Sequence, residues 1–264
     1  MNADVTLDCY AISDKGLKRR VNEDTHLCRP EGLFLVADGM GGANCGDIAS
    51  QLTATVFENS IMPYILDEEA TVPFEHSNEG DWFTHAMKHA AEQTNEAVLQ
   101  SVAENQSCRG MGSTLTAAVL HDGFIYIAHV GDSRFYQYSD ENLKLVTQDH
   151  TRVQEMVNSK LISPEEARNH PNRHVITRCV GRKNQFKPDL IKIEFIPDTL
   201  YMLCSDGLYD MVGDFYIEEI VRQNLSLEDM AGQLVEGANQ KGGKDNITIV
   251  FFGQSLNFSD GVIC

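Results

Sequence analysis

The stretch Val36-Ala37-Asp38-Gly39-Met40-Gly41-Gly42 ends an apolar run and passes directly into glycines. The apolar residues predict a buried strand over 33–37, and the glycines permit a tight loop with positive φ before a helix. A glycine after an aspartate also leaves the backbone carbonyl sterically open, so Asp38 and Gly39 together offer two oxygen ligands to a hard cation. The alternative interpretation is a strand-to-helix turn that needs its glycines for backbone geometry alone.

Three further aspartates stand at the ends of apolar runs. Asp132 follows the run 125–130, Asp206 follows 201–204, and Asp245 precedes 247–252. Adjacent antiparallel strands place the end of one beside the start of the next, so these carboxylates can gather with Asp38 at one edge of a sheet. In isolation Asp245 is better explained as a turn residue, because Gly242-Gly243-Lys244-Asp245-Asn246 has the composition of a turn.

Such a group of carboxylates suits Mg²⁺ or Mn²⁺. These ions prefer carboxylate and carbonyl oxygens and keep several waters, so two or three aspartates per ion suffice. Two ions about 3.5–4 Å apart, bridged by one carboxylate, would activate a water and neutralise charge on a transferring phosphoryl group. The sequence therefore predicts metal-assisted hydrolysis at Asp38, Asp206 and Asp245.

The motif Asn22-Glu23-Asp24 lies just after a basic cluster, Lys18-Arg19-Arg20. The carboxylates of Glu23 and Asp24 suit contacts to metal-bound waters, and an arginine beside a metal centre presents a planar fork to a phosphate. The residues alone do not separate Arg19 from Arg20. A solvated turn beside a basic surface cluster would explain the same pattern.

Composition excludes several classes of protein. The 264 residues carry a formal net charge of −18, which disfavours binding to nucleic acid because such binding depends on Lys and Arg releasing counterions. No run approaches the roughly 18 apolar residues that span a bilayer, and the first residues lack the basic and apolar regions of a secretion signal. We expect a single domain over 1–264, cytoplasmic, that binds neither nucleic acid nor membrane.

Cysteine and histidine spacing suggests no zinc site. The seven cysteines are widely spaced, odd in number and without a Cys-x-x-Cys pair, which argues against a disulfide framework, so we expect reduced thiols. His85 and His89 are four residues apart on a predicted helix but lack an acidic third ligand, so we expect a solvated helix face. His150, His170 and His174 are candidates for proton transfer only if their segment folds over the site.

The periodicity of apolar residues predicts antiparallel sheet covered by helices, an α+β fold. The predicted strands are a pair over 6–13 and 25–36, a meander over 112–149, and strands at 189–195, 199–204 and after 245. The predicted helices cover 47–59, 82–103, 215–222 and 227–241. Residues 151–182 combine two short helices with few large apolar side chains, and we predict that they form a surface flap.

With its motifs in this order, the sequence resembles the metal-dependent Ser/Thr protein phosphatases, the PPM or type 2C family, and in particular the compact bacterial enzymes. The likeness runs from about residue 8 to residue 253. The stretch 36–42 is similar to the family signature, and Arg19 precedes Asn22-Glu23-Asp24 as the family's phosphate-contacting arginine does. The resemblance implies a four-layer α/β/β/α sandwich of two antiparallel sheets flanked by helices, with a variable flap that residues 151–182 match.

The resemblance also implies roles for the acidic residues. Asp38 would bridge both metals, Gly39 would bind one through its carbonyl, and Asp206 and Asp245 would be ligands of the other. The segment Gly131-Asp132-Ser133-Arg134 resembles the one whose aspartate joins Asp206 in a third, weaker site. The implied activity is removal of phosphate from phosphoserine and phosphothreonine in proteins, opposing a Ser/Thr kinase, and we expect a monomer.

One departure and two alternatives remain. Animal members carry a histidine directly after the Asp-Gly, proposed as general acid, where this chain has Met40; a metal-bound water or a flap residue would then protonate the leaving oxygen. A catalytically silent binding or regulatory module with the same fold would be expected to lose metal carboxylates, yet Asp38, Asp206 and Asp245 are all present. A hydrolase of small phosphate esters would share the chemistry and differ only in substrate.

Overall fold

The computed structural model describes residues 7–41, 45–67, 81–254 and 256. The strands are β1 (Leu7–Asp14), β2 (Asp24–Arg29), β3 (Leu33–Met40), β4 (Gly112–Ser113), β5 (Leu115–His121), β6 (Phe124–Val130), β7 (Arg134–Ser139), β8 (Asn142–Leu145), β9 (Asp189–Glu194), β10 (Leu200–Cys204) and β11 (Ile247–Gln254). The helices are α1 (Gly46–Leu66), α2 (Trp82–Glu104), the 3₁₀ helix η1 (Gln106–Cys108), α3 (Arg152–Asn158), α4 (Pro164–Arg168), α5 (Asp206–Val212), α6 (Asp214–Val221) and α7 (Leu227–Gln240).

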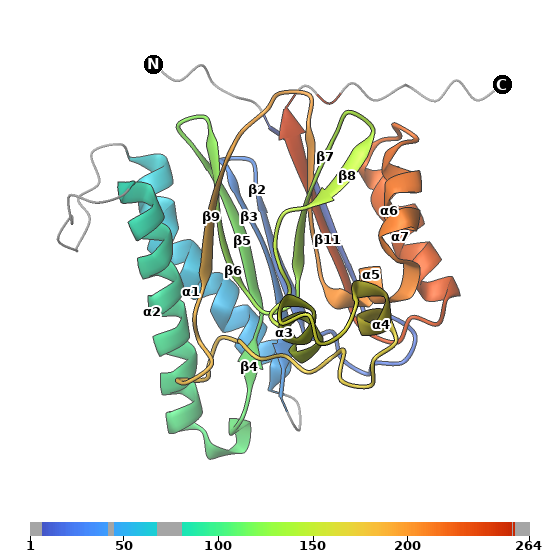
Figure 1. The fold of residues 1–264 in the computed structure, drawn as a ribbon. Coiled ribbons are helices and arrows are strands. Elements are labelled where there is room, and N and C mark those ends of the chain that lie inside the picture. The colour runs from blue at the N-terminus through green and yellow to red at the C-terminus, as the bar shows by residue number, and fades with distance from the viewer. Residues whose placement is uncertain (1–6, 42–44, 68–80, 255, 257–264) are drawn as a thin grey trace.

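Two antiparallel sheets lie between two layers of helices (Figure 1). One sheet has the order β1-β11-β10-β7-β8, and the other has the order β2-β3-β5-β6-β9 with the short β4 paired to the end of β3. Helices α1 and α2 cover the second sheet, while α6 and α7 cover the first. The four-layer α+β sandwich that the sequence and the family resemblance predicted is confirmed.

The apolar run before Asp38 is buried on both faces of β3. Leu33 and Leu35 pack into the core beneath α1 and α2, whereas Phe34 packs into the core between the sheets. The ring of Phe34 stacks on Phe252 of β11, in the opposite sheet, with centroids 3.9 Å apart. Because side chains alternate along a strand, Asp38 continues the side of Phe34 and faces the opposite sheet.

The expected pairing of 6–13 with 25–36 is wrong. β1 pairs with β11 in one sheet, and β2 pairs with β3 in the other. The second predicted strand contains a turn at Pro30, closed by the Gly32 N–H donating to the Arg29 carbonyl at 2.9 Å, so 25–36 forms a hairpin by itself. The chain between β1 and β2 therefore crosses from one sheet to the other.

Two helices differ from the prediction. α1 runs to Leu66, past Pro63, where the sequence predicted its end near residue 59. α5 was not predicted at all, because its seven residues are too few to show a clear helical period. The polar composition of residues 63–81 predicts irregular structure; the stretch begins inside α1, which ends at Leu66, and most of the remainder lies outside the described residues.

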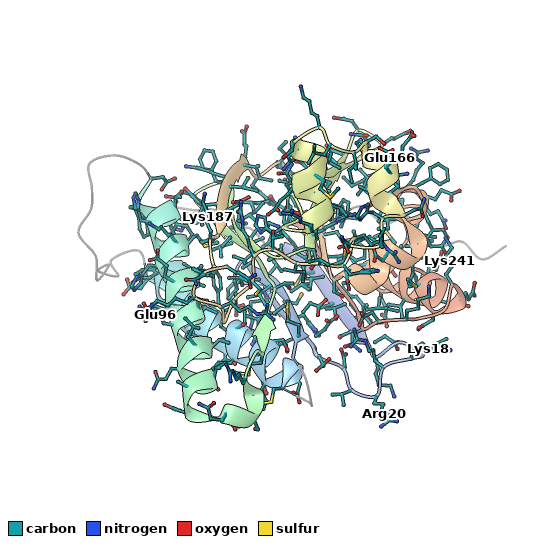
Figure 2. All side chains as sticks on the ribbon, turned by 60° about the horizontal axis from the view of Figure 1, so that its bottom comes forward. Lys18, Arg20, Glu96, Glu166, Lys187 and Lys241 are labelled. Atoms are coloured by element: carbon teal, nitrogen blue, oxygen red, sulfur yellow. A yellow bond between two sulfur atoms is a disulfide. The ribbon has the colours of Figure 1, made fainter. Side chains whose placement is uncertain are left out.

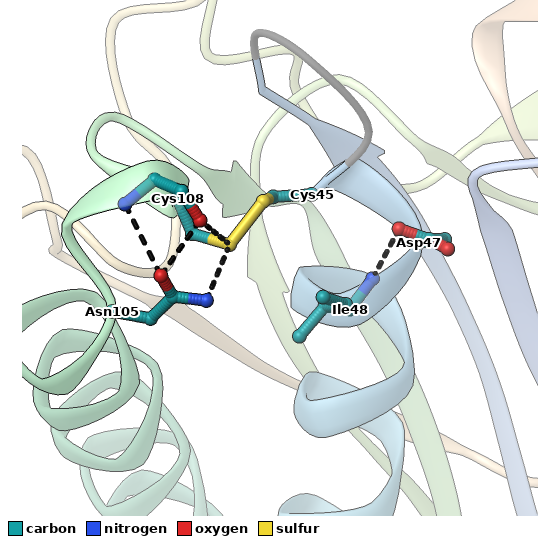
Figure 3. Close-up of a disulfide and its surroundings, with 6 residues drawn as sticks. Cys45, Asp47, Ile48, Asn105 and Cys108 are labelled. Atoms are coloured by element: carbon teal, nitrogen blue, oxygen red, sulfur yellow. Dashed lines mark hydrogen bonds between the residues drawn. A yellow bond between two sulfur atoms is a disulfide. The ribbon is translucent and has the colours of Figure 1, made fainter.

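A disulfide joins Cys45 and Cys108, contrary to the expectation of reduced thiols throughout (Figure 3). Cys45 directly precedes α1, and Cys108 lies in η1, which follows α2. The bond therefore ties the start of α1 to the segment just after the end of α2, and these two helices cover the same sheet. Sequence spacing could not reveal it because the partners are 63 residues apart and meet only through tertiary packing. Cys9, Cys28, Cys179 and Cys204 are free thiols.

Residues 151–182 contain the two short helices that were predicted, α3 and α4. A bridge of Thr151 with Ile176 closes the segment on itself, and a bridge of Val180 with Ser113 of β4 ties its end to the sheet. Within the described part of the chain, no helix is long and apolar enough to cross a bilayer.

Candidate metal centre

One cavity of about 440 Å³ gathers nearly all the site residues that the sequence predicted. Its lining includes the following predicted residues: Arg19, Glu23, Asp38, Gly39, Asp132, Asp206 and Asp245. Asp24 lies directly behind it, as the register partner of Asp38 on the neighbouring strand β2. We call Asp24, Asp38, Asp132 and Asp206 the acidic cluster.

The strand ends deliver these carboxylates to one place. Asp38 is near the end of β3, and Asp132 follows β6 in the same sheet. From the other sheet come Asp206, the first residue of α5 after β10, and Asp245, just before β11. Since β10 and β11 are antiparallel neighbours, the end of one meets the start of the other, as the sequence predicted.

Backbone contacts hold these ends together where two glycines stand. A Cβ on Gly39 would lie 1.9 Å from the Gly46 carbonyl oxygen, and a Cβ on Gly207 would lie 1.9 Å from that of Asn246. No side chain fits at either place, so α1 closes against β3 and α5 closes against the turn before β11. Close backbone packing is therefore a second requirement for Gly39, beyond the open carbonyl that the sequence suggested.

The acidic cluster is electrostatically strained without a cation. Burial raises the pKa of Asp38 well above its usual range, and the carboxylates of Asp24, Asp206 and Asp132 raise it further. Burial likewise raises the pKa of Asp206, with Asp132 the largest neighbouring contribution. Burial raises the pKa of Asp132 to about 7 and that of Asp24 to about 6. Each shift reflects negative charge brought together away from water.

The oxygens of the cluster fit a hard divalent cation. Among the described residues, Oδ1 of Asp24, Asp132 and Asp206 are buried without a hydrogen-bond partner. Buried polar atoms are normally paired, and carboxylate oxygens are the ligands that Mg²⁺ and Mn²⁺ prefer. The donor set is therefore suited to such ions and lacks the thiolates that would favour softer metals.

The other oxygen of Asp24 is held in place. Its Oδ2 accepts hydrogen bonds of 2.7 Å from Ser205 Oγ and Thr248 Oγ1. Glu23 is fixed through its backbone, because its N–H donates to Asn246 Oδ1 at 2.9 Å. Asn246 in turn donates to the carbonyls of Lys15 and Val21, so the loop carrying Arg19 and Glu23 is tied to the start of β11.

The structure separates the two adjacent arginines. A guanidinium nitrogen of Arg19, Nη2, donates to Asp245 Oδ2 at 2.7 Å, and Nη1 lies 3.6 Å from a Glu23 carboxylate oxygen. This hydrogen bond with Asp245 raises the pKa of Arg19, despite the opposing effect of burial. Arg20 is exposed and extends outward at the rim of the molecule, as its label in Figure 2 shows.

Of the flap histidines, His174 reaches the cavity. It lines the wall, and its Nδ1 is 3.2 Å from Asp210 Oδ2. His150 instead packs below the flap, where its Nδ1 accepts from the Gly131 N–H and its Nε2 is 3.1 Å from Asp189 Oδ2. His170 is exposed and accepts from the Asn172 N–H.

Sequence reasoning missed Asp210, which also lines the cavity. It stands one helical turn after Asp206 on α5, and single oxygens or nitrogens of His174, Asp206 and Asp210 lie within 4.8 Å of one another. Burial raises the pKa of Asp210, while His174 opposes the rise. The i, i+4 spacing of the two aspartates would have revealed this residue had α5 been predicted.

Comparison with known proteins agrees with this geometry. The family profile of protein phosphatase 2C matches residues 18–246. The serine/threonine phosphatase stp of Listeria monocytogenes serotype 4b is 33% identical over 248 residues, covering 92% of this chain and 94% of that protein. The protein phosphatase PhpP of Streptococcus pneumoniae is 32% identical over 258 residues, covering 96% and 99%.

Solved structures give the same result. The serine/threonine phosphatase PstP/Ppp of Mycobacterium tuberculosis superposes with a TM-score of 0.83 at 35% identity, covering 94% of this chain and 98% of that one. The PstP catalytic domain in complex with 2 manganese ions has a TM-score of 0.79 at 33% identity, covering 94% and 97%. The chain therefore belongs to the protein phosphatase 2C family. Within that family it is a serine/threonine phosphatase similar to the compact bacterial enzymes.

Proposed function

We propose that this phosphatase hydrolyses phosphoserine and phosphothreonine in proteins at a binuclear Mn²⁺ or Mg²⁺ centre. The observation that carries the proposal is the acidic cluster, in which buried oxygens of Asp24, Asp132 and Asp206 lack hydrogen-bond partners among the described residues. Burying a carboxylate without a partner is costly, and a divalent cation removes that cost. The manganese ions of the similar PstP domain support the choice of metal.

The proposed ligand roles are those that the family resemblance implies, and the positions of the residues are compatible with them. Asp38 projects from β3 toward the opposite sheet and would bridge the two ions, with the Gly39 carbonyl on one of them and Asp206 and Asp245 on the other. Glu23 and Asp24 would act through metal-bound waters, with Asp24 oriented by the hydrogen bonds of Ser205 and Thr248 to its Oδ2. Asp132 would share a third, weaker ion with Asp206.

When bound, the divalent ions would supply a water activated for attack and would neutralise negative charge on the phosphoryl group. Arg19 stands at the mouth with its side chain 46% exposed. Its planar fork has five N–H donors, so a phosphate oxygen can be bound while Asp245 keeps the group in place. Arg19 therefore binds and orients the phosphate rather than reacting with it.

His174 is the flap histidine that we propose as proton donor to the leaving serine or threonine oxygen. Met40 lines the cavity but has no proton to give, whereas His174 lines it with an ionisable ring. Asp210 accepts at the Nδ1 side, which leaves Nε2–H for the leaving group. Arg173 and Ile176 accompany His174 in the wall, so the flap, residues 151–182, would govern access of protein substrates to this single domain.

The decisive experiment measures phosphate release from a phosphothreonine peptide by the purified full chain. Turnover is expected with added Mn²⁺ or Mg²⁺ and none in excess chelator, because no other nucleophile is proposed. A small aryl phosphate, tested in parallel, addresses the reading in which only small esters are substrates. Undiminished turnover in chelator would reject the metal mechanism, and turnover of the aryl phosphate alone would reject the protein substrate. The opposing kinase and the expected monomeric state belong to the same proposal.

A further inference from the structure

Asp132 and the carboxylates of α5 reach the cavity from different sheets. Asp132 follows β6, whereas α5 follows β10 in the other sheet and carries Asp206 and Asp210. From Asp132 the chain continues into β7, which pairs with β10 through Arg134 and Cys204, so one ladder ends two residues from Asp132 and two residues from Asp206. Contacts beyond that last ladder pair set the remaining separation of the two side chains. A cation shared by two side chains needs that separation held within about 0.5 Å.

One side chain spans this junction. Tyr209 lies on α5 between the two aspartates of that helix, and its hydroxyl donates to the Asp132 backbone carbonyl at 3.0 Å. The tyrosine is 9% exposed, so this hydrogen bond is shielded from water. The contact fixes the main chain of Asp132, while Oδ1 of the same residue stays without a partner among the described residues. Tyr209 thus orients Asp132 without occupying that oxygen.

The opposite side of the Asp132 loop is tied to Asp38. The Asp38 N–H donates to Thr114 Oγ1 at 2.8 Å, and that hydroxyl is 2.7 Å from Ser133 Oγ. The loop is therefore fastened to its own sheet through Thr114 and to α5 through Tyr209. The tyrosine hydroxyl adds to these hydrogen bonds, and to the pairing of Arg134 with Cys204, a direct link between the Asp132 main chain and α5.

Tyr209 is itself held by a group that we call the arginine cluster, which is largely buried except for Asp214: Arg134, Tyr136, Asp149, Tyr209 and Asp214. The Arg134 guanidinium lies over the Tyr209 ring, with its central carbon 3.5 Å from the ring centroid. Two parallel hydrogen bonds of 2.9 and 2.8 Å join Arg134 to Asp149. This stack fixes the ring of Tyr209, and hence the direction of its hydroxyl.

We propose that Tyr209 is a positioning residue that sets the distance between Asp132 and the carboxylates of α5, and thereby the affinity of the weakest of the bound divalent cations. The inference rests on the proposed function, in which Asp132 and Asp206 share an ion. It concerns a residue that contacts neither substrate nor metal, and acts only through the Asp132 main chain. A purely structural tyrosine would affect stability without changing metal affinity.

The test compares two buried tyrosines of the arginine cluster. Tyr209→Phe removes the hydroxyl that meets Asp132. Tyr136→Phe is the matched control, because its hydroxyl donates to Asp214 at 2.8 Å and accepts from Arg134 at 3.1 Å, whereas the Tyr209 hydroxyl donates to Asp132. Mn²⁺ alone is titrated into each metal-free full chain by calorimetry, and melting curves establish that each is folded.

Tyr209→Phe should weaken the last Mn²⁺ binding step by about tenfold, the low end for loss of an outer-sphere partner, with turnover recovering at high Mn²⁺. Tyr136→Phe should lower the melting temperature about as much as Tyr209→Phe does, but it should leave the Mn²⁺ titration unchanged. Arg134→Lys, which keeps the hydroxyl but removes the planar group from the ring, should weaken the same step by a smaller factor.

Identical Mn²⁺ titrations for Tyr209→Phe and the parent protein would overturn the proposal, as would equal weakening in both tyrosine variants. Should Tyr209→Phe be unfolded, an unchanged Mn²⁺ titration for Arg134→Lys would overturn it. Failure of the proposed function is a separate result, seen when the parent binds Mn²⁺ but releases no phosphate from the peptide.

Discussion

The acidic cluster and the arginine cluster meet at Asp132, yet they differ in how their charges are compensated. In the arginine cluster, Arg134 bonds to both oxygens of Asp149 and contacts Asp214 at 3.3 Å. In the acidic cluster, carboxylates face one another, and burial together with their mutual repulsion raises the pKa of Asp38. Both groups are built on strand ends of the same sandwich.

The difference separates scaffold from site. A buried charged group that supplies its own partners gains structure from them and needs nothing from outside. A buried group of like charges remains incomplete until a cation arrives, so its stability and its activity both depend on that cation. The two charged clusters therefore differ in their partners: Arg134 is paired with carboxylates, whereas Asp38 is surrounded by other carboxylates.

The largest expected effect comes from a substitution in the acidic cluster. Asp38→Asn keeps the shape of the side chain but removes the charge that would bridge two ions. Phosphatase activity should fall by more than about 100-fold. Loss of a residue that only supports a metal ligand costs up to about 100-fold, and loss of a direct ligand should cost more. The melting temperature of the metal-free protein should stay equal or rise, because repulsion is relieved. Activity within threefold of the parent would contradict the assignment of Asp38.

The corresponding change in the arginine cluster should act on stability. Asp149→Asn removes the closer anionic partner of the Arg134 guanidinium, whose side chain is only 17% exposed, and leaves the 3.3 Å contact with Asp214. Unfolding in urea should show a loss of about 3 kcal/mol, the usual result of breaking a buried ion pair. Glu155→Gln is the control, since its exposed pair with Arg152 should contribute under about 0.5 kcal/mol. Equal losses in the two variants would reject the contrast.

A smaller effect is expected at the mouth of the cavity. Arg19→Ala should raise KM for a phosphopeptide by about tenfold, the worth of one charged hydrogen bond, with little change in kcat. Arg20→Ala should change neither, because Arg20 extends outward from the rim. Steady-state kinetics of both variants provide the measurement, and equal changes in KM would show that Arg19 has no special position.

The smallest expected effect concerns pH. Burial raises the pKa of Asp24 to about 6 and that of Asp132 to about 7. A carboxyl whose pKa is raised by folding stabilises the fold while protonated, and that contribution is lost as pH rises through the folded-state pKa. The metal-free protein should therefore lose stability between pH 5.5 and 7.5, measured as a melting temperature that falls by several degrees. Excess Mg²⁺ should remove this dependence; a melting temperature that rises with pH would contradict it.

Sequence reasoning succeeded where the signal was local. Asp38, Asp132, Asp206 and Asp245 each adjoin an apolar run, and antiparallel pairing brings such ends together whichever strands pair. The order of helical and strand-like periods predicted helices packed on antiparallel sheet, and the family resemblance predicted the four layers.

The rest depended on contacts between distant segments. The pairing of β1 with β11 joins the two ends of the chain, and no local pattern specifies it. Asp210 was missed because α5 is a single short helix, and Tyr209 because its partner is a main-chain carbonyl 77 residues away. Arg19 and Arg20 are neighbours of the same type, and only the direction of each side chain in the folded loop separates them.

The disulfide between Cys45 and Cys108 has a consequence for how much of the enzyme a cell would hold. Closing a loop of 63 residues removes freedom from the unfolded chain and is worth about 4 kcal/mol in the loop-entropy account. Thiol reductants keep such bonds open in most cytosols and oxidising compartments preserve them. Because proteases degrade the unfolded fraction, the redox state of the surroundings would change the lifetime of this chain before it changed the rate of any single molecule.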